Sequence, residues 1–209
     1  ERGHLTRVDH AEDAHRHMID AYFAWQARGK RVALVTGANS DAGALNDEIQ
    51  QRRVDRGELD PTVLAWGMGE QRILVGDTVQ TRRNDRRVGV ENRATWVVSK
   101  IAEDSLLLRS VNDSGDVRKV TRVYALEHVQ LAYASTVHGI QGETTDASIV
   151  GPGVDASGLY VGMTRGRSHN EAIAVARTDA LARAPRPATL SSLRHRRGGG
   201  RPPPRGRGG

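Results

Sequence analysis

Two short segments of the sequence carry side chains that could bind phosphate groups. The first, TVHGIQGET, runs from Thr136 to Thr144, and its two glycines would let the backbone pass close to a ligand. Its threonine, histidine and glutamine side chains offer hydrogen bonds to phosphate or sugar groups. The second, LYVGMTRGR, runs from Leu159 to Arg167, and Arg165 and Arg167 could each donate a bidentate pair of hydrogen bonds to phosphate. Together the two segments favour a site for a phosphate-bearing ligand.

The sequence lacks the loop that usually cradles the β- and γ-phosphates of a nucleotide. No G-x-x-x-x-G-K-[ST] pattern occurs. Gly29-Lys30 is the only Gly-Lys pair, and Ala24 stands where the first glycine of such a loop would be. Asp47-Glu48 falls inside a predicted helix, not at the end of an apolar strand, so it is a poor magnesium-binding pair. The phosphate cradle and the Mg²⁺ ligands would come from elsewhere, and the isolated chain should not hydrolyse ATP.

Alternating helical and strand patterns surround the two segments. Residues Ala11 to Gly29 predict an amphipathic helix, and the apolar run Val32 to Val35 predicts a buried parallel strand. A second helix should begin with Ser40 as its cap and end near Arg56-Gly57. Later in the chain the pattern predicts strands at Val129–Tyr133, Ala147–Val150 and Ala172–Ala176, and a helix at Leu159–Arg167. This order predicts an α/β domain built on a parallel sheet.

The stretch from Gly76 to about His128 has a different pattern of short strands and turns. The expected strands, rich in β-branched residues, are Thr78–Arg82, Thr95–Ile101, Leu106–Val111 and Val117–Val123. Asn112-Asp113-Ser114-Gly115 should form the hairpin turn between the last two. Several short strands in succession predict a small barrel of the SH3 or OB kind, inserted into the α/β domain.

The positive charge of the chain is concentrated at its end. The formal net charge is +6, but from Pro185 onward there are seven Arg, no Lys and no acidic residue. Removing those seven from the 31 basic residues leaves 24 against 25 acidic ones in the first 184 residues. We expect the Arg/Gly/Pro tail to be disordered. Nucleic-acid binding by the folded part would therefore depend on local clusters such as Arg82, Arg83, Arg86 and Arg87, which could equally form a solvated turn.

Other features of the composition narrow the class of protein. Cysteine is absent, which excludes a disulfide framework and a cysteine-based zinc site. No apolar run approaches the roughly 18 residues of a membrane span, and no signal peptide precedes the first predicted helix. We expect a cytoplasmic protein without a membrane partner. The first residue is Glu1 instead of Met, so we expect a fragment or a processed product of a longer chain.

In their order and wording, the two phosphate-binding segments resemble motifs V and VI of superfamily 1 DNA helicases. TxHxxQG starts at Thr136 and LYVxxTRxR at Leu159, with a strand-like segment between them. The wording most resembles the RecD-like helicase portion of conjugative relaxases. The upstream helix–strand–helix pattern, with the loop TGANSDAGALN, resembles the start of the second, C-terminal RecA-like domain of these helicases. Residues Gly76 to Val98 resemble the start of their inserted SH3-like barrel, and the whole resemblance covers about Ala11 to Arg177.

The resemblance implies a fold and a division of the chain. The fold is an α/β RecA-like domain of the P-loop-NTPase type, without the P-loop itself, and with an inserted small SH3-like β-barrel. We expect residues 1–75 to form the first part of the RecA-like domain and residues 76–128 the barrel. Residues 129–184 should form the second part, with motifs V and VI, and residues 185–209 the disordered tail.

The resemblance also implies roles for individual residues. Arg165 matches the arginine finger, which stabilises the charge that spreads over the γ-phosphoryl group in the transition state. The residues that match the nucleotide-binding side are Gln141, Gly142, Glu143 and Arg167. In many relatives the acidic residue lies two positions after the glycine, whereas here Glu143 follows Gly142 directly. The residues expected to contact DNA are Thr136, His138, Asn39, Arg82 and Arg83. The loop Thr36–Asn39 lacks the arginine that some branches have there.

The predicted function follows from these roles. The chain would be the second motor domain of an ATP-dependent single-strand DNA translocase or helicase in conjugative DNA transfer, inactive alone. Its partners would be single-stranded DNA and an N-terminal RecA-like domain that supplies the P-loop and the ligands of Mg²⁺. Two alternatives remain open: a non-enzymatic nucleic-acid-binding module, and a decayed helicase remnant. We expect no metal site in this chain, and no residues for relaxase nicking.

Overall fold

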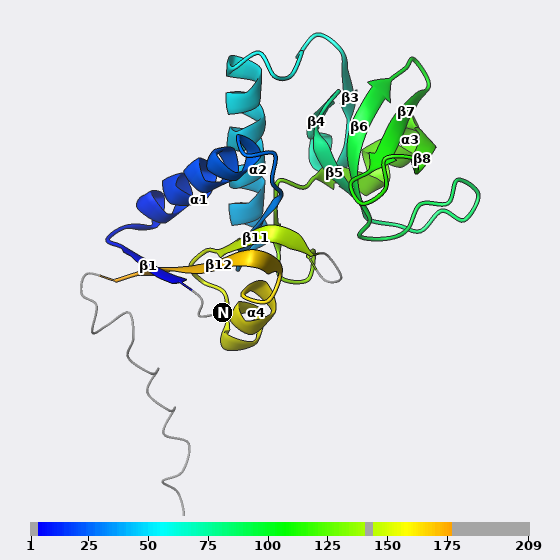
Figure 1. Ribbon diagram of the computed structural model, residues 1–209. Helices are drawn as coiled ribbons and strands as arrows, with labels where there is room; N and C mark the ends of the chain where they lie inside the picture. Colours follow the sequence, from blue (N-terminus) through cyan, green and yellow to red (C-terminus); the bar gives the residue numbers. More distant parts are fainter. Residues whose placement is uncertain (1–3, 141–143, 177–209) are drawn as a thin grey trace, which may run out of the picture.

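Two five-stranded sheets organise the protein (Figure 1). The computed structural model describes residues 4–140 and 144–176. One sheet is parallel, with the strand order β1-β12-β11-β2-β10, and the other is antiparallel, with the order β8-β7-β6-β5-β9. The predicted tail, residues 185–209, lies outside the described residues.

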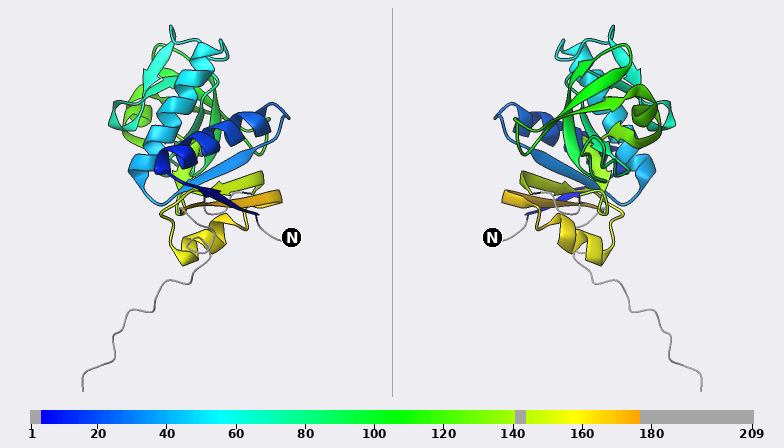
Figure 2. Two further views of the ribbon diagram at one scale, coloured as in Figure 1. Left: turned by 90° about the vertical axis from the view of Figure 1, so that its left-hand side faces the viewer. Right: turned by 90° about the vertical axis from the view of Figure 1, so that its right-hand side faces the viewer.

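The parallel sheet is covered by helices on both sides. Its strands are β1 (His4–Val8), β2 (Val32–Thr36), β10 (Ala134–Thr136), β11 (Thr145–Val150) and β12 (Gly166–Val175). Helices α1 (Ala11–Gln26) and α2 (Asn39–Asp55) lie on one side, and α4 (Ala156–Gly162) lies on the other (Figure 2). The central strands β2 and β11 are almost continuously buried, as expected for strands covered on both faces. The predicted α/β class is confirmed.

The start of α2 differs from the prediction. Ser40 was expected as the cap, but it lies inside the helix, which begins at Asn39 after Ala38. The backbone stays extended through Ala38 (φ −130°, ψ 151°), so the helix can start one residue before the position that the serine favours. No side chain caps the helix start; the Ser40 hydroxyl instead donates to the Asp41 carboxylate at 3.4 Å.

The antiparallel sheet is formed by the stretch with the strand-and-turn pattern. Its strands are β5 (Thr78–Thr81), β6 (Thr95–Ile101), β7 (Ser105–Ser110), β8 (Val117–Thr121) and β9 (Val129–Leu131). The hairpin turn between β7 and β8 is confirmed, with the Asp113 carboxylate accepting from the Gly115 N–H at 2.9 Å. Strands β8 and β9 form the two edges of the sheet. Closure into an SH3-like barrel stays a prediction.

Several elements were missed or misplaced by the sequence patterns. Strand β8 ends at Thr121, whose side chain accepts from the Tyr124 N–H and caps helix α3 (Arg122–His128). Strand β9 was expected in the α/β part, but it belongs to the antiparallel sheet, where it pairs with β5. Edge strand β1, the pair β3 (Leu64–Trp66) and β4 (Arg72–Leu74), and the 3₁₀ turn η1 (Met68–Glu70) were not predicted.

The helix predicted at Leu159–Arg167 was also wrong in its bounds. Helix α4 starts after Asp155, whose carboxylate accepts from the Gly158 N–H at 2.6 Å, and it ends at Gly162. Strand β12 then begins at Gly166, where an added Cβ would come within 2.0 Å of the His169 carbonyl oxygen. This close approach requires a glycine at position 166, and Arg165 lies in the turn between the helix and the strand.

One stripe of polar side chains on α2 holds the two sheets together. Asn46, Gln50 and Arg53 follow one another at helical spacing. Asn46 donates to the carbonyls of Leu131 and Ala134 and accepts from the Ala134 N–H at 2.8 Å. The buried apolar side chains of both sheets also form one connected cluster. The relative position of the two sheets is therefore fixed by polar and apolar contacts together.

The buried carboxyl of Asp77 completes this contact at the start of β5. Gln50 donates to it at 2.6 Å, Tyr133 at 2.5 Å and the Leu74 N–H at 2.7 Å. Burial raises the pKa of Asp77 above its ordinary value, although these three hydrogen bonds act in the opposite direction. Arg53 donates to the Tyr133 hydroxyl at 2.8 Å and extends the network to the end of α2.

Candidate functional site

The carboxyl ends of β2 and β10 lie side by side in the parallel sheet. Thr36, at the end of β2, pairs in register with Thr136, at the end of β10. His138 is exposed in the turn that follows Thr136, and Asn39 is exposed at the first residue of α2. Three of the five expected DNA-binding residues therefore lie on neighbouring segments at this carboxyl edge. Open α/β sheets commonly bind ligands at this edge.

A close backbone contact shapes the same edge. An added Cβ on Gly37 would come within 2.4 Å of the Gly153 carbonyl oxygen. The Thr36 hydroxyl donates to the Ala38 carbonyl at 2.9 Å and closes the loop between β2 and α2. This loop is consequently pressed against the loop that follows β11. A side chain at Gly37 would force the two loops apart.

The segment after Thr136 leaves the carboxyl edge along the face covered by α4. The Gly139 N–H donates to the Thr136 carbonyl at 2.8 Å and forms a tight turn. Ile140 is buried in a small apolar cluster with Ala33, Val35 and Val150. Three expected nucleotide-binding residues, Gln141, Gly142 and Glu143, lie outside the described residues.

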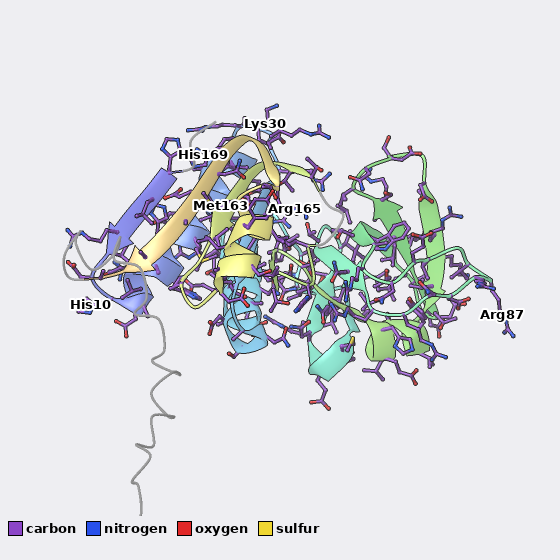
Figure 3. The ribbon with its side chains drawn as sticks, turned by 90° about the horizontal axis from the view of Figure 1, so that it is seen from below. His10, Lys30, Arg87, Met163, Arg165 and His169 are labelled. Carbon is purple, nitrogen blue, oxygen red and sulfur yellow. The ribbon has the colours of Figure 1, made fainter. Side chains whose placement is uncertain are left out.

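Arg165 lies at the opposite, amino edge of the parallel sheet. Its N–H donates to the Gly162 carbonyl at 3.1 Å, and its carbonyl accepts from the Thr145 N–H at 3.0 Å. It therefore lies in the turn between α4 and β12, beside the first residue of β11, and it is half-buried. Figure 3 shows it on the side of Lys30 and His169, away from His10. Arg167, expected to contact nucleotide, is exposed two residues further along β12.

The two remaining DNA-binding candidates, Arg82 and Arg83, are exposed in the loop after β5. The Arg82 guanidinium donates to the Gln80 side-chain oxygen at 3.1 Å. The Gln80 amide nitrogen in turn donates to the Gly139 carbonyl at 2.9 Å. The arginine loop is therefore linked through one buried glutamine to the turn that carries His138.

Gln80 is a residue of this site that the sequence reasoning missed. It is only 2% exposed, and its side-chain nitrogen donates to the carbonyls of Arg93, in the loop before β6, and of Gly139, in the turn after β10. A glutamine within a β-branched strand pattern gave no signal of such a role, because Gly139 is distant in the sequence. A buried amide with several hydrogen bonds typically fixes one arrangement of the segments that it joins.

The described residues offer no ready metal site. Within the ranges 4–140 and 144–176, no group of three or more His, Cys, Asp or Glu side chains is placed to hold a metal ion. Over the same ranges, no helix is both long and apolar enough to cross a membrane.

Comparison with known proteins identifies relatives in sequence. No family model matches the chain. An alignment of 106 residues, covering 47% of the chain, is 27% identical to the multifunctional conjugation protein TraI of Escherichia coli strain K12. The aligned part is 6% of the length of TraI, so the similarity concerns a small part of that protein.

Comparison with solved structures identifies the fold. Bacteroides Pif1 bound to ssDNA matches 74% of this chain and 42% of its own chain, with a TM-score of 0.50 and 16% identity. A structure of two coordinating Pif1 helicases that unwind forked dsDNA matches 84% and 49%, also with a TM-score of 0.50 and 16% identity. The chain thus spans less than half the length of these helicases. The helicase resemblance predicted from the motifs is confirmed, because the chain is similar in sequence to a small part of TraI and its fold matches part of the Pif1 helicases; the RecD-like subtype stays a prediction.

Proposed function

We propose that this chain is the second motor domain of an ATP-dependent single-strand DNA translocase or helicase that acts in conjugative DNA transfer. One observation carries the proposal. The described motif residues divide between the two edges of the parallel sheet: Thr136 and His138 lie at the carboxyl edge, and Thr145 and Arg165 lie at the amino edge. A motor domain needs both a nucleotide side and a DNA side, because a change at the nucleotide must be transmitted to the DNA.

At the amino edge, the proposed partner of Arg165 is the γ-phosphate of ATP. ATP supplies the phosphoanhydride bond, and a second RecA-like domain with a P-loop would hold it together with Mg²⁺. Arg165 suits this role because the Thr145 and Gly162 contacts fix its backbone while its position between α4 and β12 leaves it half-buried. A guanidinium held in place stabilises transition-state charge without having to reorganise.

At the carboxyl edge, the proposed ligand is the backbone of single-stranded DNA. Thr136 and His138 would donate to phosphate oxygens, and Asn39 would contact the strand from the neighbouring loop. The named relatives support this choice, because one matched Pif1 structure is bound to ssDNA and TraI is a conjugation protein. Arg82 and Arg83 would extend the contact along the strand.

The proposal keeps the expected division of the chain. Residues 1–75 and 129–184 would form the RecA-like domain, residues 76–128 the inserted SH3-like barrel of a RecD-like helicase, and residues 185–209 the tail. The antiparallel order β8-β7-β6-β5-β9 is compatible with a small barrel. Superposing an experimental structure of this sheet on known SH3 domains tests the assignment of the barrel.

The experiment compares this chain alone with a two-domain protein, in which the chain is joined to its P-loop-bearing RecA-like domain. We expect DNA-stimulated ATP hydrolysis from the two-domain protein and none from the chain alone. A two-domain protein that binds both ATP and DNA without hydrolysing ATP would contradict the motor proposal. That result would favour the alternative of a nucleic-acid-binding module or a decayed helicase remnant.

A further inference from the structure

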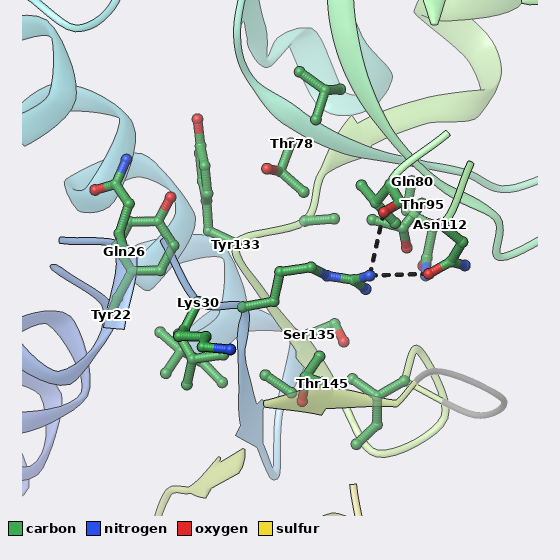
Figure 4. Close-up of a pocket in the computed structure, with 18 of the residues that line it drawn as sticks. Tyr22, Gln26, Lys30, Thr78, Gln80, Thr95, Asn112, Tyr133, Ser135 and Thr145 are labelled. Atoms are coloured by element: carbon green, nitrogen blue, oxygen red, sulfur yellow. Dashed lines mark hydrogen bonds between the residues drawn. The ribbon is translucent and has the colours of Figure 1, made fainter. Parts of the chain in front are cut away.

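A cleft of about 700 Å³ lies between the parallel and antiparallel sheets, on the side of α1 and α2 (Figure 4). One wall comes from α1, the start of β2 and the loop before β10; the other comes from β5, β6 and the β7–β8 hairpin. Its volume is in the range of small-molecule binding sites. The site residues Arg165, Thr136 and His138 are not part of its lining, although Ile140, within motif V, and Thr145, shortly after it, are.

The lining of the cleft has an unusual charge composition. It contains four basic residues, Lys30, Arg31, Arg53 and Arg109, and no Asp or Glu among the described residues that line it. The chain before Pro185 has one more acidic than basic residue, so this positive charge is a local feature and not a consequence of composition. Hydroxyl and amide side chains supply most of the remaining polar lining: Tyr22, Gln26, Thr78, Gln80, Thr95, Ser110, Asn112, Ser114, Tyr133, Ser135 and Thr145.

Arg31 is held across the cleft by neutral acceptors. Its guanidinium donates to the Asn112 side-chain oxygen at 2.9 Å and to the Val111 carbonyl at 3.3 Å, and Figure 4 marks both hydrogen bonds. By contrast, Lys30 is 3.4 Å from the Asp146 carboxylate and Arg53 is 3.1 Å from the Glu58 carboxylate. Among the described residues, no carboxylate forms an ion pair with the Arg31 guanidinium, although the Arg31 backbone N–H donates to the Asp146 carboxylate at 2.9 Å. A guanidinium oriented in this way is prepared to receive an anion.

Arg109 adds a guanidinium on the other wall of the cleft, and Tyr22 and Tyr133 add hydroxyl groups at its back. Arg109 is exposed near the end of β7, on the strand that leads into the Asn112 turn. Tyr22 and Tyr133 contact each other edge to face, with ring centroids 5.5 Å apart. Burial raises the pKa of Tyr22 to about 12, so its hydroxyl stays protonated and can donate a hydrogen bond. Cations on two walls with neutral donors between them form a binding environment for a phosphate group.

We propose that this cleft binds the phosphate groups of a nucleotide or of a nucleic-acid strand, at a site that adjoins the amino edge of the parallel sheet but does not include Arg165, Thr136 or His138. The charge and the lining of the cleft carry this inference, so it goes beyond the motor function and also holds for a non-enzymatic module. Because Ile140 and Thr145 line the cleft, a bound phosphate would lie beside described residues within motif V and shortly after it. Phosphate binding here would therefore influence the position of these residues.

The test is a titration of the full chain with inorganic pyrophosphate, followed by the amide NMR signals of Ser135, Thr145 and Asn112. Site-resolved signals separate binding in the cleft from binding to the arginine-rich tail. We expect saturable shifts in the unchanged protein. Arg31→Ala should weaken the affinity about tenfold, as expected for loss of a charged hydrogen bond. Arg109→Ala, at an exposed position, should also weaken it and serves if Arg31→Ala does not fold.

Two control variants separate charge from structure. Asn112→Ala removes the acceptor that orients Arg31 but keeps the positive charge, so its affinity should fall less than that of Arg31→Ala. Arg16→Ala removes a positive charge from the exposed face of α1, outside the cleft, and should leave the affinity unchanged. If the cleft signals do not move, or if Arg16→Ala has the same effect as Arg31→Ala, the proposal is overturned.

A second titration, with a short oligothymidylate, identifies the source of the phosphate. Tighter binding of the oligonucleotide in the cleft assigns a strand, and tighter binding of pyrophosphate assigns a free nucleotide; both support the site. Neither titration measures ATP turnover. Failure of this inference would therefore leave the motor proposal standing, and loss of turnover in the two-domain protein would leave the cleft assignment standing.

Discussion

The carboxyl and amino edges of the parallel sheet differ in chemistry. The carboxyl edge presents the hydroxyl of Thr136, the imidazole of His138 and the amide of Asn39. The amino edge carries Arg165, beside the start of β11, and Lys30, which precedes β2 and is paired with the Asp146 carboxylate. Small hydrogen-bonding side chains suit the repeated contacts of a strand that must move, whereas a fixed cation suits a phosphoryl group whose charge changes during reaction.

The described residues on either side of positions 141–143 are held at different edges of the sheet. Residues 137–140 are fixed at the carboxyl edge by the Gly139–Thr136 hydrogen bond and by Gln80, and Thr145 is fixed at the amino edge by Arg165. Strands β10 and β11 are separated in the sheet by β2. In the proposed motor, a shift of Arg165 toward a nucleotide would act first on Thr145, its hydrogen-bond partner at the start of β11. Substitutions at the two edges should therefore have separate effects.

The largest expected effect is that of Arg165→Ala on ATP turnover in the two-domain protein. We expect kcat to fall about a thousandfold, because arginine fingers contribute at least that much to phosphoryl transfer. DNA affinity should be unchanged, because the residue is at the amino edge. Steady-state ATPase assays and DNA-binding isotherms measure the two quantities. Arg16→Ala is the control with the same charge change, and an Arg165→Ala protein with unaltered turnover would refute the assignment.

Asn46→Ala should destabilise the carboxyl edge more than the amino edge. Asn46 satisfies two carbonyls and one N–H at the connection into β10, so its loss should cost about 2–3 kcal/mol of unfolding free energy. Urea denaturation measures the cost, and amide exchange should increase in β10 more than in β12. The exposed Asn39→Ala, on the same helix, should change the stability by less than about 0.5 kcal/mol. Equal acceleration of exchange in both strands would argue against a local effect.

His138→Ala should affect DNA binding more modestly. We expect single-strand affinity to fall about threefold to tenfold, consistent with loss of one backbone contact. Fluorescence anisotropy with a labelled oligothymidylate measures it in the full chain, where the tail contributes equally to every variant. His10→Ala, an exposed histidine before α1, is the matched control. A His138→Ala protein that binds as tightly as the unchanged chain would remove His138 from the DNA site.

A smaller loss of stability than that of Asn46→Ala is expected from a change at Glu171, in the middle of β12 and between the two edges. Burial alone would raise the pKa of Glu171, but hydrogen bonds from Thr6 and His169, and the hydrogen bond and charge of His17, hold it below its ordinary value. A carboxyl with a lowered pKa in the folded state adds stability above its ordinary pKa, and this stability is lost as the pH falls through the lowered value. The ionised side chain therefore stabilises the fold at neutral pH.

Glu171→Gln should accordingly lower the unfolding free energy at neutral pH by about 1–2 kcal/mol. The difference from the unchanged chain should shrink as the pH falls below the ordinary glutamate pKa. Chemical denaturation at a series of pH values measures this, with the exposed Glu12→Gln as the control. A difference that is constant with pH would show that the stabilisation does not depend on the charge.

The sequence predicted elements whose signal is local and missed those that depend on distant partners. The core helix α1 and strand β2 follow from the spacing of apolar residues, and the β7–β8 turn follows from its turn residues. Strand β1 has a weak pattern, and it forms because β12 offers it a parallel edge. Strand β9 has a clear pattern, but the pattern does not reveal that its partner is β5.

The candidate site shows the same limit. The motifs located Thr136, His138 and Arg165. The helix expected to include Arg165 ends at Gly162, and β12 begins at Gly166, where only a glycine fits. The division of the residues between two edges depends on strand order, which the sequence alone does not state. Gln80 and the cleft around Arg31 depend on contacts between the two sheets, and no local pattern indicates them.

The most direct test of the two-edge account is the ATP turnover of the two-domain protein, measured as a function of single-stranded DNA concentration. His138→Ala should raise the DNA concentration that gives half-maximal stimulation and leave the maximal rate nearly unchanged. Arg165→Ala should abolish most of the maximal rate and leave the half-maximal DNA concentration unchanged. If both variants change the two quantities in the same proportion, the edges do not have separate roles and the account is wrong.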